Sequence, residues 1–240
     1  MAKFEKANSV GEWLDQRLNL TTFNKVMMTE YWIPKDINFL WAMGVLLATT
    51  FSILIVSGIF LMMYYKPDIN LAFDSVNYTI MQEVAFGWLF RHMHGVAASV
   101  VFLIIYIHMF TGIYYGSYKQ GREMIWISGM LLFMTFSAAG FSGYMLPWRQ
   151  MSYWAAMVIT NLFGGVPVIG DALVVWIRGD FNVADATLTR FFMLHVFLLP
   201  ITIMGIIGVH FYTLRIPHVN NQTSEEFDYD EEAEKYLAGN

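Results

Sequence analysis

The chain has 240 residues, of which 57% are hydrophobic, 17% are aromatic and only 14% are charged, and its formal net charge is -5. This composition indicates a membrane protein rather than a soluble domain or a nucleic-acid-binding protein, because the charged residues are concentrated between apolar segments. Since the chain has no cysteine, disulfides and cofactors held through cysteine sulfur are excluded.

The first 36 residues are polar and mildly amphipathic, with Trp13 and Leu18 set among charged side chains. They lack the basic start, the short apolar run and the small-residue cleavage site of a signal peptide. We expect residues 1–36 to form a helix that lies on the cytoplasmic surface of the membrane.

Four apolar segments are long enough to cross a hydrocarbon core of about 30 Å. They are Phe39–Tyr64, Phe86–Tyr115, Ile125–Leu146 and Phe191–Leu214. They predict an all-α membrane protein in which residues 37–218 form a bundle of four transmembrane helices.

The connection between the third and fourth spans, residues 147–189, is too interrupted by glycine and proline to cross a membrane. Its apolar stretches Tyr153–Leu162 and Asp171–Ile177 predict two short helices in the membrane interface. Residues 219–240 are polar and acidic, and we expect them to form a solvated tail or linker.

Four histidines lie inside the apolar spans, where an ionisable side chain is costly and usually functional. They form two pairs along the chain, His94 with His108 and His195 with His210. A step of 14 residues is about four helical turns and rises ~21 Å, so each pair presents imidazoles at two depths. Two facing helices would then give each of two irons two axial ligands. This pattern predicts two haems that are stacked across the bilayer.

Glycines on the other two spans repeat the 14-residue step, Gly44 with Gly58 and Gly129 with Gly143. A porphyrin fits between helices only where the flanking backbone carries no side chain. Close packing of small residues is the alternative explanation. Two glycine pairs with the histidine spacing favour clearance for haem.

Basic residues predict the orientation of the spans. Eight lie in the N-terminal segment, the second connection and the end of the last span, and five lie on the other side. Of these five, Arg91 and Arg190 are near proposed ligands and could instead pair with haem propionates. We therefore expect both termini in the cytoplasm.

Several strings of the sequence, in order and spacing, resemble cytochrome b, the subunit of quinol:cytochrome c oxidoreductases and of the related plastoquinol complexes. They are Arg91-x-x-His94-Gly95, Gly143-Tyr-Met-Leu-Pro-Trp148-x-Gln150-Met-Ser-Tyr-Trp154, Ile159-Thr-Asn161 followed by Pro167-x-Ile-Gly170, and Thr189-Arg190-Phe-Phe-x-x-His195. The resemblance covers about residues 10–218.

The resemblance implies that His94 and His195 hold the low-potential haem near the outer face. It implies that His108 and His210 hold the high-potential haem near the cytoplasm. It also implies that Arg91 and Arg190 contact the low-potential haem and that Ser117 and Trp126 contact the high-potential haem. The outer quinol pocket would be lined by Tyr144, Met151, Ala155, Val158 and Ile159. The cytoplasmic quinone site would be lined by Trp41 and Arg215.

The resemblance also implies the activity. Quinol would be oxidised at the outer pocket, with one electron passing to a Rieske iron–sulfur protein that serves a c-type cytochrome. The other electron would cross the two haems to reduce quinone on the cytoplasmic side. We expect a proton-translocating, homodimeric complex in a bacterial cytoplasmic or equivalent energy-transducing membrane, in which this chain is not active alone and supplies no catalytic side chain.

The sequence departs from the family in several places. The chain ends after the fourth span, so the C-terminal half of the family, with its Pro-Glu-Trp-Tyr motif, is expected as a separate polypeptide or a missing segment. The 15-residue step from His195 to His210 matches the split form of the family. Ala42 stands where that form has a haem-tethering cysteine, so we expect two non-covalent b-type haems. Thr111 replaces an arginine near the inner haem, and Arg149 fills a position that is usually glycine or aspartate.

Two other interpretations remain open from the residues. A dihaem membrane anchor of another quinone-linked dehydrogenase shares the histidine pairs but not the Gly143–Trp154 string. A transporter whose histidines carry protons would be expected to have carboxylates inside the membrane, and the four spans contain none.

Overall fold

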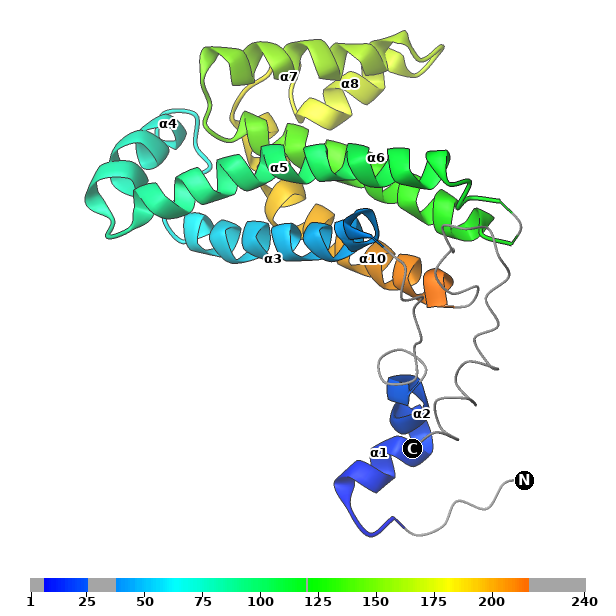
Figure 1. Cartoon of the computed structure of the whole chain (residues 1–240). Helices are drawn as coiled ribbons and strands as arrows, with labels where there is room; N and C mark the ends of the chain where they lie inside the picture. The colour runs from blue at the N-terminus through cyan, green and yellow to red at the C-terminus, as the bar shows by residue number, and fades with distance from the viewer. Residues whose placement is uncertain (1–6, 26–37, 120, 216–240) are drawn as a thin grey trace.

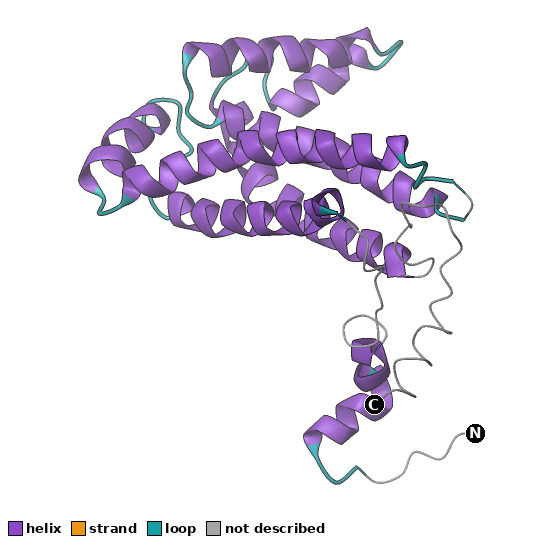
Figure 2. Cartoon of the chain, in the orientation of Figure 1, coloured by secondary structure: helices purple, strands orange, loops and turns teal. Residues whose placement is uncertain are grey.

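The computed structural model describes residues 7–25, 38–119 and 121–215, and in these ranges the secondary structure is helical, without strands (Figures 1 and 2). Four helical segments are long and apolar enough to cross a membrane: Phe39–Met62, Gly87–Tyr114, Glu123–Met145 and Asp185–Arg215. They overlap the four predicted spans, and the all-α four-helix membrane fold is confirmed. The fourth segment begins at Asp185 because a short helix continues directly into the span.

The first span is the 3-10 turn η2, Phe39–Ala42, followed by α3, Met43–Met62. The second and third spans are single helices, α5 at Gly87–Tyr114 and α6 at Glu123–Met145. The fourth span consists of α9, Asp185–Met193, the π-helical turn η5, Leu194–Leu198, and α10, Leu199–Arg215.

The bundle is built from two helix pairs, α3 with α5 and α6 with α10 (Figure 1). An apolar middle layer joins the pairs and includes the buried residues Val101 and Ile105 of α5, Phe136 of α6 and Ile203 of α10. Phe51 of α3 packs against this layer, and its ring centroid lies 5.5 Å from that of Phe136. Val101 is midway in the chain between His94 and His108, so the middle layer separates two histidine levels.

Two helices of the long connection, α7 at Gln150–Leu162 and α8 at Gly170–Arg178, form a separate layer at the top of Figure 1. They cover the two predicted helical stretches of this connection. Their location in the membrane interface stays a prediction. The layer is attached to the bundle by a second apolar cluster that contains Met145, Ala156 and Phe191.

The buried side chain of Arg178 ties α7 to α8. Its Nε donates a hydrogen bond to Oγ1 of Thr160 at 2.8 Å, and its Nη2 donates to Oδ1 of Asn161 at 2.8 Å. Neutral acceptors satisfy the guanidinium where water is excluded. This contact explains why threonine and asparagine follow Ile159.

The N-terminal segment contains α1, Val10–Leu18, and α2, Leu20–Asn24. Ser9 begins α1 as an N-cap whose Oγ accepts a hydrogen bond from the backbone N–H of Glu12 at 3.1 Å. Helix is therefore present inside the predicted surface segment. Its position on the membrane stays a prediction, and residues 1–6, 26–37 and the proposed tail, 219–240, lie outside the described residues.

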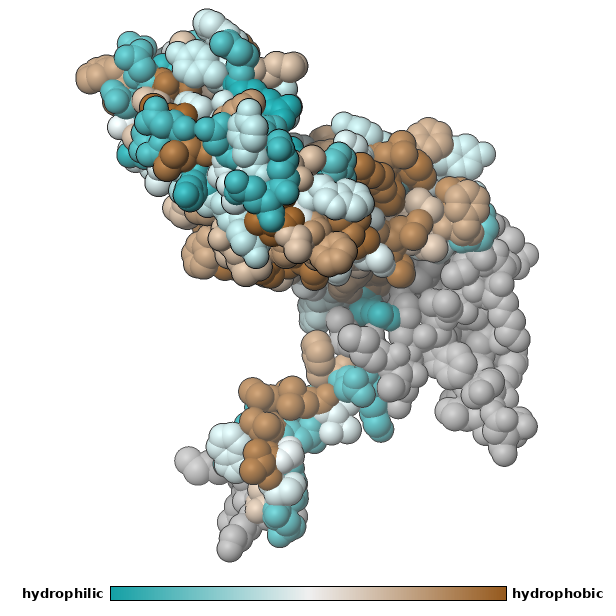
Figure 3. All heavy atoms as spheres, turned by 90° about the vertical axis from the view of Figure 1, so that its left-hand side faces the viewer, coloured by the Kyte–Doolittle hydropathy of each residue, from teal (hydrophilic) through white to brown (hydrophobic). Residues whose placement is uncertain are grey.

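The first connection adds α4, Ala72–Asp74, and the π-helical turn η3, Ser75–Glu83, which packs against α5. Figure 3, which faces the side of the molecule that carries α4, shows hydrophobic residues over the body of the bundle and hydrophilic residues gathered in its upper part. This distribution is the one that a bundle surrounded by lipid requires.

Candidate metal centres

Two pairs of imidazole rings face each other across the bundle at two levels. At one level, His94 of α5 faces His195 of η5, with ring centroids 6.1 Å apart and planes at 81°. At the other level, His108 of α5 faces His210 of α10, with centroids 6.5 Å apart and planes at 72°. The four predicted histidines are thus brought together in two pairs.

Both separations fit a metal bound between the two rings. Metal–nitrogen bonds of about 2.0–2.1 Å on each side place the centroids of two coordinating imidazoles roughly 6.4 Å apart. The described residues contain no cluster of three or more histidine, cysteine or acidic side chains that could hold a bare ion. Two protein ligands per metal suit haem iron, because the porphyrin supplies the other four.

Three of the four imidazoles are oriented by hydrogen bonds at Nδ1. Nδ1 of His94 lies 3.0 Å from Oγ of Ser57, and Nδ1 of His210 lies 2.9 Å from Oγ of Ser128. Nδ1 of His195 lies 2.9 Å from the carbonyl oxygen of Ala139. An Nδ1–H that donates to such an oxygen leaves Nε2 as the acceptor nitrogen that a metal requires.

The serine hydroxyls are themselves held by the backbone. Oγ of Ser128 donates to the carbonyl of Met124 at 2.8 Å, so its lone pair is free to accept from the imidazole. Ser57 donates in the same way to the carbonyl of Ile53. Ser142 donates to the carbonyl of Ala138 at 2.8 Å, and its Oγ lies 3.4 Å from Nδ1 of His195.

The four predicted glycines each face one of the histidine rings. A Cβ atom on Gly58 would lie 3.2 Å from Cε1 of His94, and one on Gly129 would lie 3.3 Å from Cε1 of His210. A Cβ on Gly143 would collide with the ring of His195, whereas Gly44 would place it at an ordinary 3.9 Å from His108. The glycines therefore provide space for the imidazoles themselves, which the clearance argument for the porphyrin did not anticipate.

Ser57, Ser128 and Ser142 are functional candidates that sequence reasoning missed, and all three are buried. The available signal was the Ser-Gly dipeptide, which occurs at Gly58, Gly129 and Gly143. In each dipeptide, the serine lies near Nδ1 of the same histidine whose ring the glycine faces. At Gly44 the preceding residue is Met43, and within the described part of the chain no side-chain hydrogen bond orients His108.

A cavity of ≈ 270 Å³ surrounds the level of His108 and His210. Its wall includes the predicted contacts Ser117, Trp126 and Trp41, together with Thr111 and Arg122. The rings of Trp41 and Tyr115 pack at an angle of 61°, with centroids 4.8 Å apart. Thr111 stands where the family usually has an arginine, and Arg122 supplies an arginine in the wall of the same cavity.

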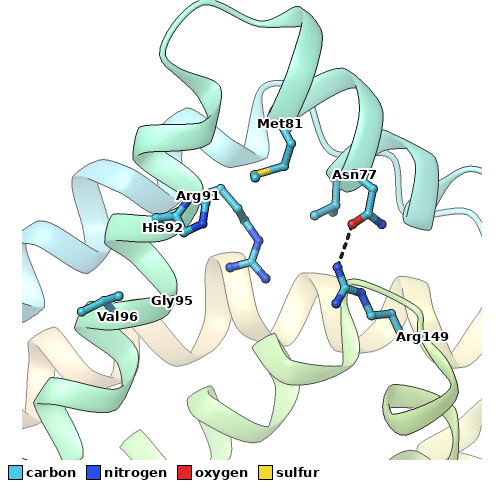
Figure 4. Close-up of a pocket in the computed structure, with 8 residues that line it drawn as sticks. Asn77, Met81, Arg91, His92, Gly95, Val96 and Arg149 are labelled. Atoms are coloured by element: carbon cyan, nitrogen blue, oxygen red, sulfur yellow. Dashed lines mark hydrogen bonds between the residues drawn. The ribbon is translucent and has the colours of Figure 1, made fainter.

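Arg91 and Arg190, the two arginines predicted near the level of His94 and His195, lie in different surroundings. Arg91 lines a second cavity beside α5, where Arg149 also reaches (Figure 4). The exposed Arg190 of α9 instead donates from Nη1 to the carbonyl of Trp176 at the end of α8. The structure does not bring the Arg190 side chain into either cavity.

The predicted outer quinone residues follow one stripe of α7. Met151 and Val158 are 72% and 61% exposed, and Ala155 and Ile159 on the same stripe are half-buried. Tyr144, near the end of α6, is exposed as well. The opposite face of α7 is buried against the bundle, so this stripe is available to another surface. Arg215 lies at the end of α10, half-buried, outside the wall of the inner cavity.

The chain matches the family described as Cytochrome b/b6/petB over residues 28–217. It is 48% identical over 209 residues to a cytochrome b of Allochromatium vinosum, covering 87% of this chain and 50% of the relative. It is 45% identical over 217 residues to a cytochrome b of Rickettsia conorii, covering 90% and 54%. The chain thus spans about half the length of the curated relatives it matches.

The fold is also similar to a solved chain of a hyperthermophilic respiratory Complex III, with a TM-score of 0.78 and 36% sequence identity. That match covers 96% of this chain and 65% of the solved chain. Four membrane-length helices, paired histidines and the sequence match agree, and the chain belongs to the cytochrome b/b6 family.

Proposed function

We propose that this chain is the N-terminal dihaem domain of the cytochrome b of a quinol:cytochrome c oxidoreductase. The observation that carries the proposal is the two facing imidazole pairs, with centroids 6.1 and 6.5 Å apart on opposite sides of one apolar layer. Family membership favours this function over a dehydrogenase anchor or a transporter.

Two non-covalent b-type haems would supply one-electron redox centres with both axial positions filled, which suits electron transfer rather than oxygen binding. His94 and His195 would hold the outer centre, and His108 and His210 the inner one. Ser57 and Ser128 would fix the ring orientation of one histidine at each level. Trp126 and Ser117 would line the inner cofactor, and Trp41 and Arg215 the cytoplasmic quinone site.

The exposed stripe of α7 supports an outer quinol pocket that is completed by another polypeptide. Met151, Ala155, Val158 and Ile159 would form one wall with Tyr144. The C-terminal half of cytochrome b, as a separate chain or a further segment, would form the other. We propose a Rieske protein and a c-type cytochrome as electron-accepting partners, in a homodimeric, proton-translocating complex with both termini in the cytoplasm.

Replacing His210 or His108 with leucine tests the proposed function. Each variant should lose one of two b-type absorbance components, because the level of His94 and His195 lies about four turns away. Dithionite-minus-oxidised difference spectra of membranes carrying the assembled complex provide the measurement. Retention of both components in either variant would disprove the ligand assignment, and a wild-type protein without b-type haem would disprove the function.

Ser128→Ala should change the redox potential of the inner haem without removing it. The Nδ1 hydrogen bond makes His210 a stronger donor to oxidised iron, so its loss should raise the midpoint potential. We expect roughly a threefold change in the reduction equilibrium, or about 30 mV for one electron. Redox titration of the complex measures this shift.

Ser137→Ala is the matched control for Ser128→Ala. Ser137 also lies on α6 and donates to a helix carbonyl, that of Phe133, at 2.8 Å. An equal shift in both variants would show that Ser128 contributes only to helix packing.

A further inference from the structure

A second cavity of ≈ 270 Å³ lies beside α5 at the end of the bundle that carries α7, and its wall includes Arg91 and Gly95, which flank His94 in the chain. Arg91 reaches it from α5, Asn77 from η3, and Arg149 from the residue before α7. Figure 4 shows the guanidinium groups of Arg91 and Arg149 extending into this space from opposite sides. Among the described residues, no aspartate or glutamate lines the cavity.

Arg149 is held in place by two neutral groups. Its Nη2 donates to Oδ1 of Asn77 at 2.7 Å, and its Cζ lies 5.7 Å from the ring centroid of Phe73 (Figure 4). A guanidinium has five N–H donors, so the bond to Asn77 leaves others available. These contacts orient the side chain but do not neutralise its charge.

Two like charges directed into one cavity favour an anion between them. Arg91 and Arg149 both line the cavity, so their positive charges lie near each other. A carboxylate or phosphate with two oxygens could accept from both guanidinium groups, and such charge-assisted hydrogen bonds are about twice as strong as neutral ones.

The position of the cavity indicates which anion it takes. Arg91 precedes His94 by three residues, which is a rise of ~4.5 Å, and Gly95 also lines the cavity. A haem held by His94 and His195 carries two propionates, which cannot lie unpaired in the apolar middle layer. They need cations at the end of the spans, where Arg91 and Arg149 are.

We propose that Arg149, together with Arg91, binds a propionate of the haem that His94 and His195 hold. This assignment rests on the proposed dihaem function and gives a role to a residue that departs from the usual glycine or aspartate. A cation beside the propionate stabilises the reduced, more negative state of the cofactor. Arg149 therefore raises the midpoint potential of the outer haem relative to a chain with a neutral residue there.

The test is a redox titration of the assembled complex that carries Arg149→Gln, with the inner haem as the internal reference. The reduction equilibrium of the outer haem should fall about tenfold, which corresponds to 59 mV for one electron, while the inner haem is unchanged. Arg149→Lys, which keeps the charge, should retain most of the wild-type potential. Asn77→Ala, which releases Arg149, should produce a smaller fall in the same direction.

Lys66→Gln is the matched control, because Lys66 is an exposed cation beyond α3 at the same end of the bundle and outside the cavity. An equal fall in this variant, or a change of less than about twofold in Arg149→Gln, would overturn the proposal. Unchanged potentials with a loss of co-purified anionic lipid would also overturn it and assign the cavity to a lipid phosphate. A wild-type complex without b-type haem would instead refute the proposed function.

Discussion

Gly143→Leu should abolish binding of the outer haem while the inner haem is retained. A Cβ at this position would already collide with the ring of His195, and leucine adds three further carbons. His195 would have to leave the level of His94, and its Nδ1 contact with the carbonyl of Ala139 would be lost. In a close-packed interior such a displacement has no free space to use. Haem content of the purified complex should fall from two to one per chain.

Gly205→Leu is the control for this substitution. Gly205 lies on α10 in the fourth span, and a Cβ there would meet no atom within 4 Å. The variant adds the same apolar bulk, so it should retain both haems. Full haem content in Gly143→Leu would show that His195 does not depend on this glycine.

An alanine inserted after Phe197 should also remove one haem. His195 and His210 are 15 residues apart, whereas His94 and His108 are 14 apart. In a regular α-helix the longer step would turn His195 about 100° away from the position that a 14-residue step gives. The π-helical turn at Leu194–Leu198 absorbs the additional residue, because each of its bonds spans five residues instead of four. A second additional residue has no such turn to absorb it.

Deletion of Phe197 provides the opposite test of this turn. The deletion shortens the step to 14 residues, so a regular helix would bring both histidines to their present positions. Phe197 is 61% exposed, and its removal costs little internal packing. We expect two haems per chain in the deletion and one in the insertion. Loss of a haem in the deletion, measured as pyridine haemochromogen, would show that the turn has a role other than register.

Much of the bundle could be predicted from the sequence because the length of an apolar segment indicates a membrane span. In a regular helix, a step of 14 residues also places two side chains on nearly the same face at two depths. The predicted spans and the two depths of His94 and His108 rely only on these two properties, whereas the pairing of His94 with His195 came from the resemblance to cytochrome b. The π-helical turn could not be predicted, since a 15-residue step is compatible with a rotated ligand as well as with a local bulge. Pro200 was its one local signal, because proline has no N–H to donate to the carbonyl of Val196.

The surroundings of the site were harder to predict than the ligands. Ser128 and Ser142 resemble ordinary membrane-helix serines in sequence, and their direction toward an imidazole depends on how α6 packs against the fourth span. The contact of Arg190 with the carbonyl of Trp176 near the end of α8 was not visible in the sequence, and its role beside the outer centre stays a prediction. Arg149 reaches its cavity only because η3, which is distant in sequence, presents Asn77 to it.

The apolar middle layer also bears on which charges would cross the proposed dihaem domain. The side chains of Phe51, Val101, Phe136 and Ile203 in this layer carry no group that could pass on a proton. Electrons would pass between haems on the two sides of this layer without moving any atom of it, whereas a proton needs a continuous hydrogen-bonded path. The layer would therefore act as a conductor for electrons and an insulator for protons. Each electron that crosses would add to a transmembrane voltage, about 2.3 kcal/mol per charge at 100 mV, that cannot leak back by the same route.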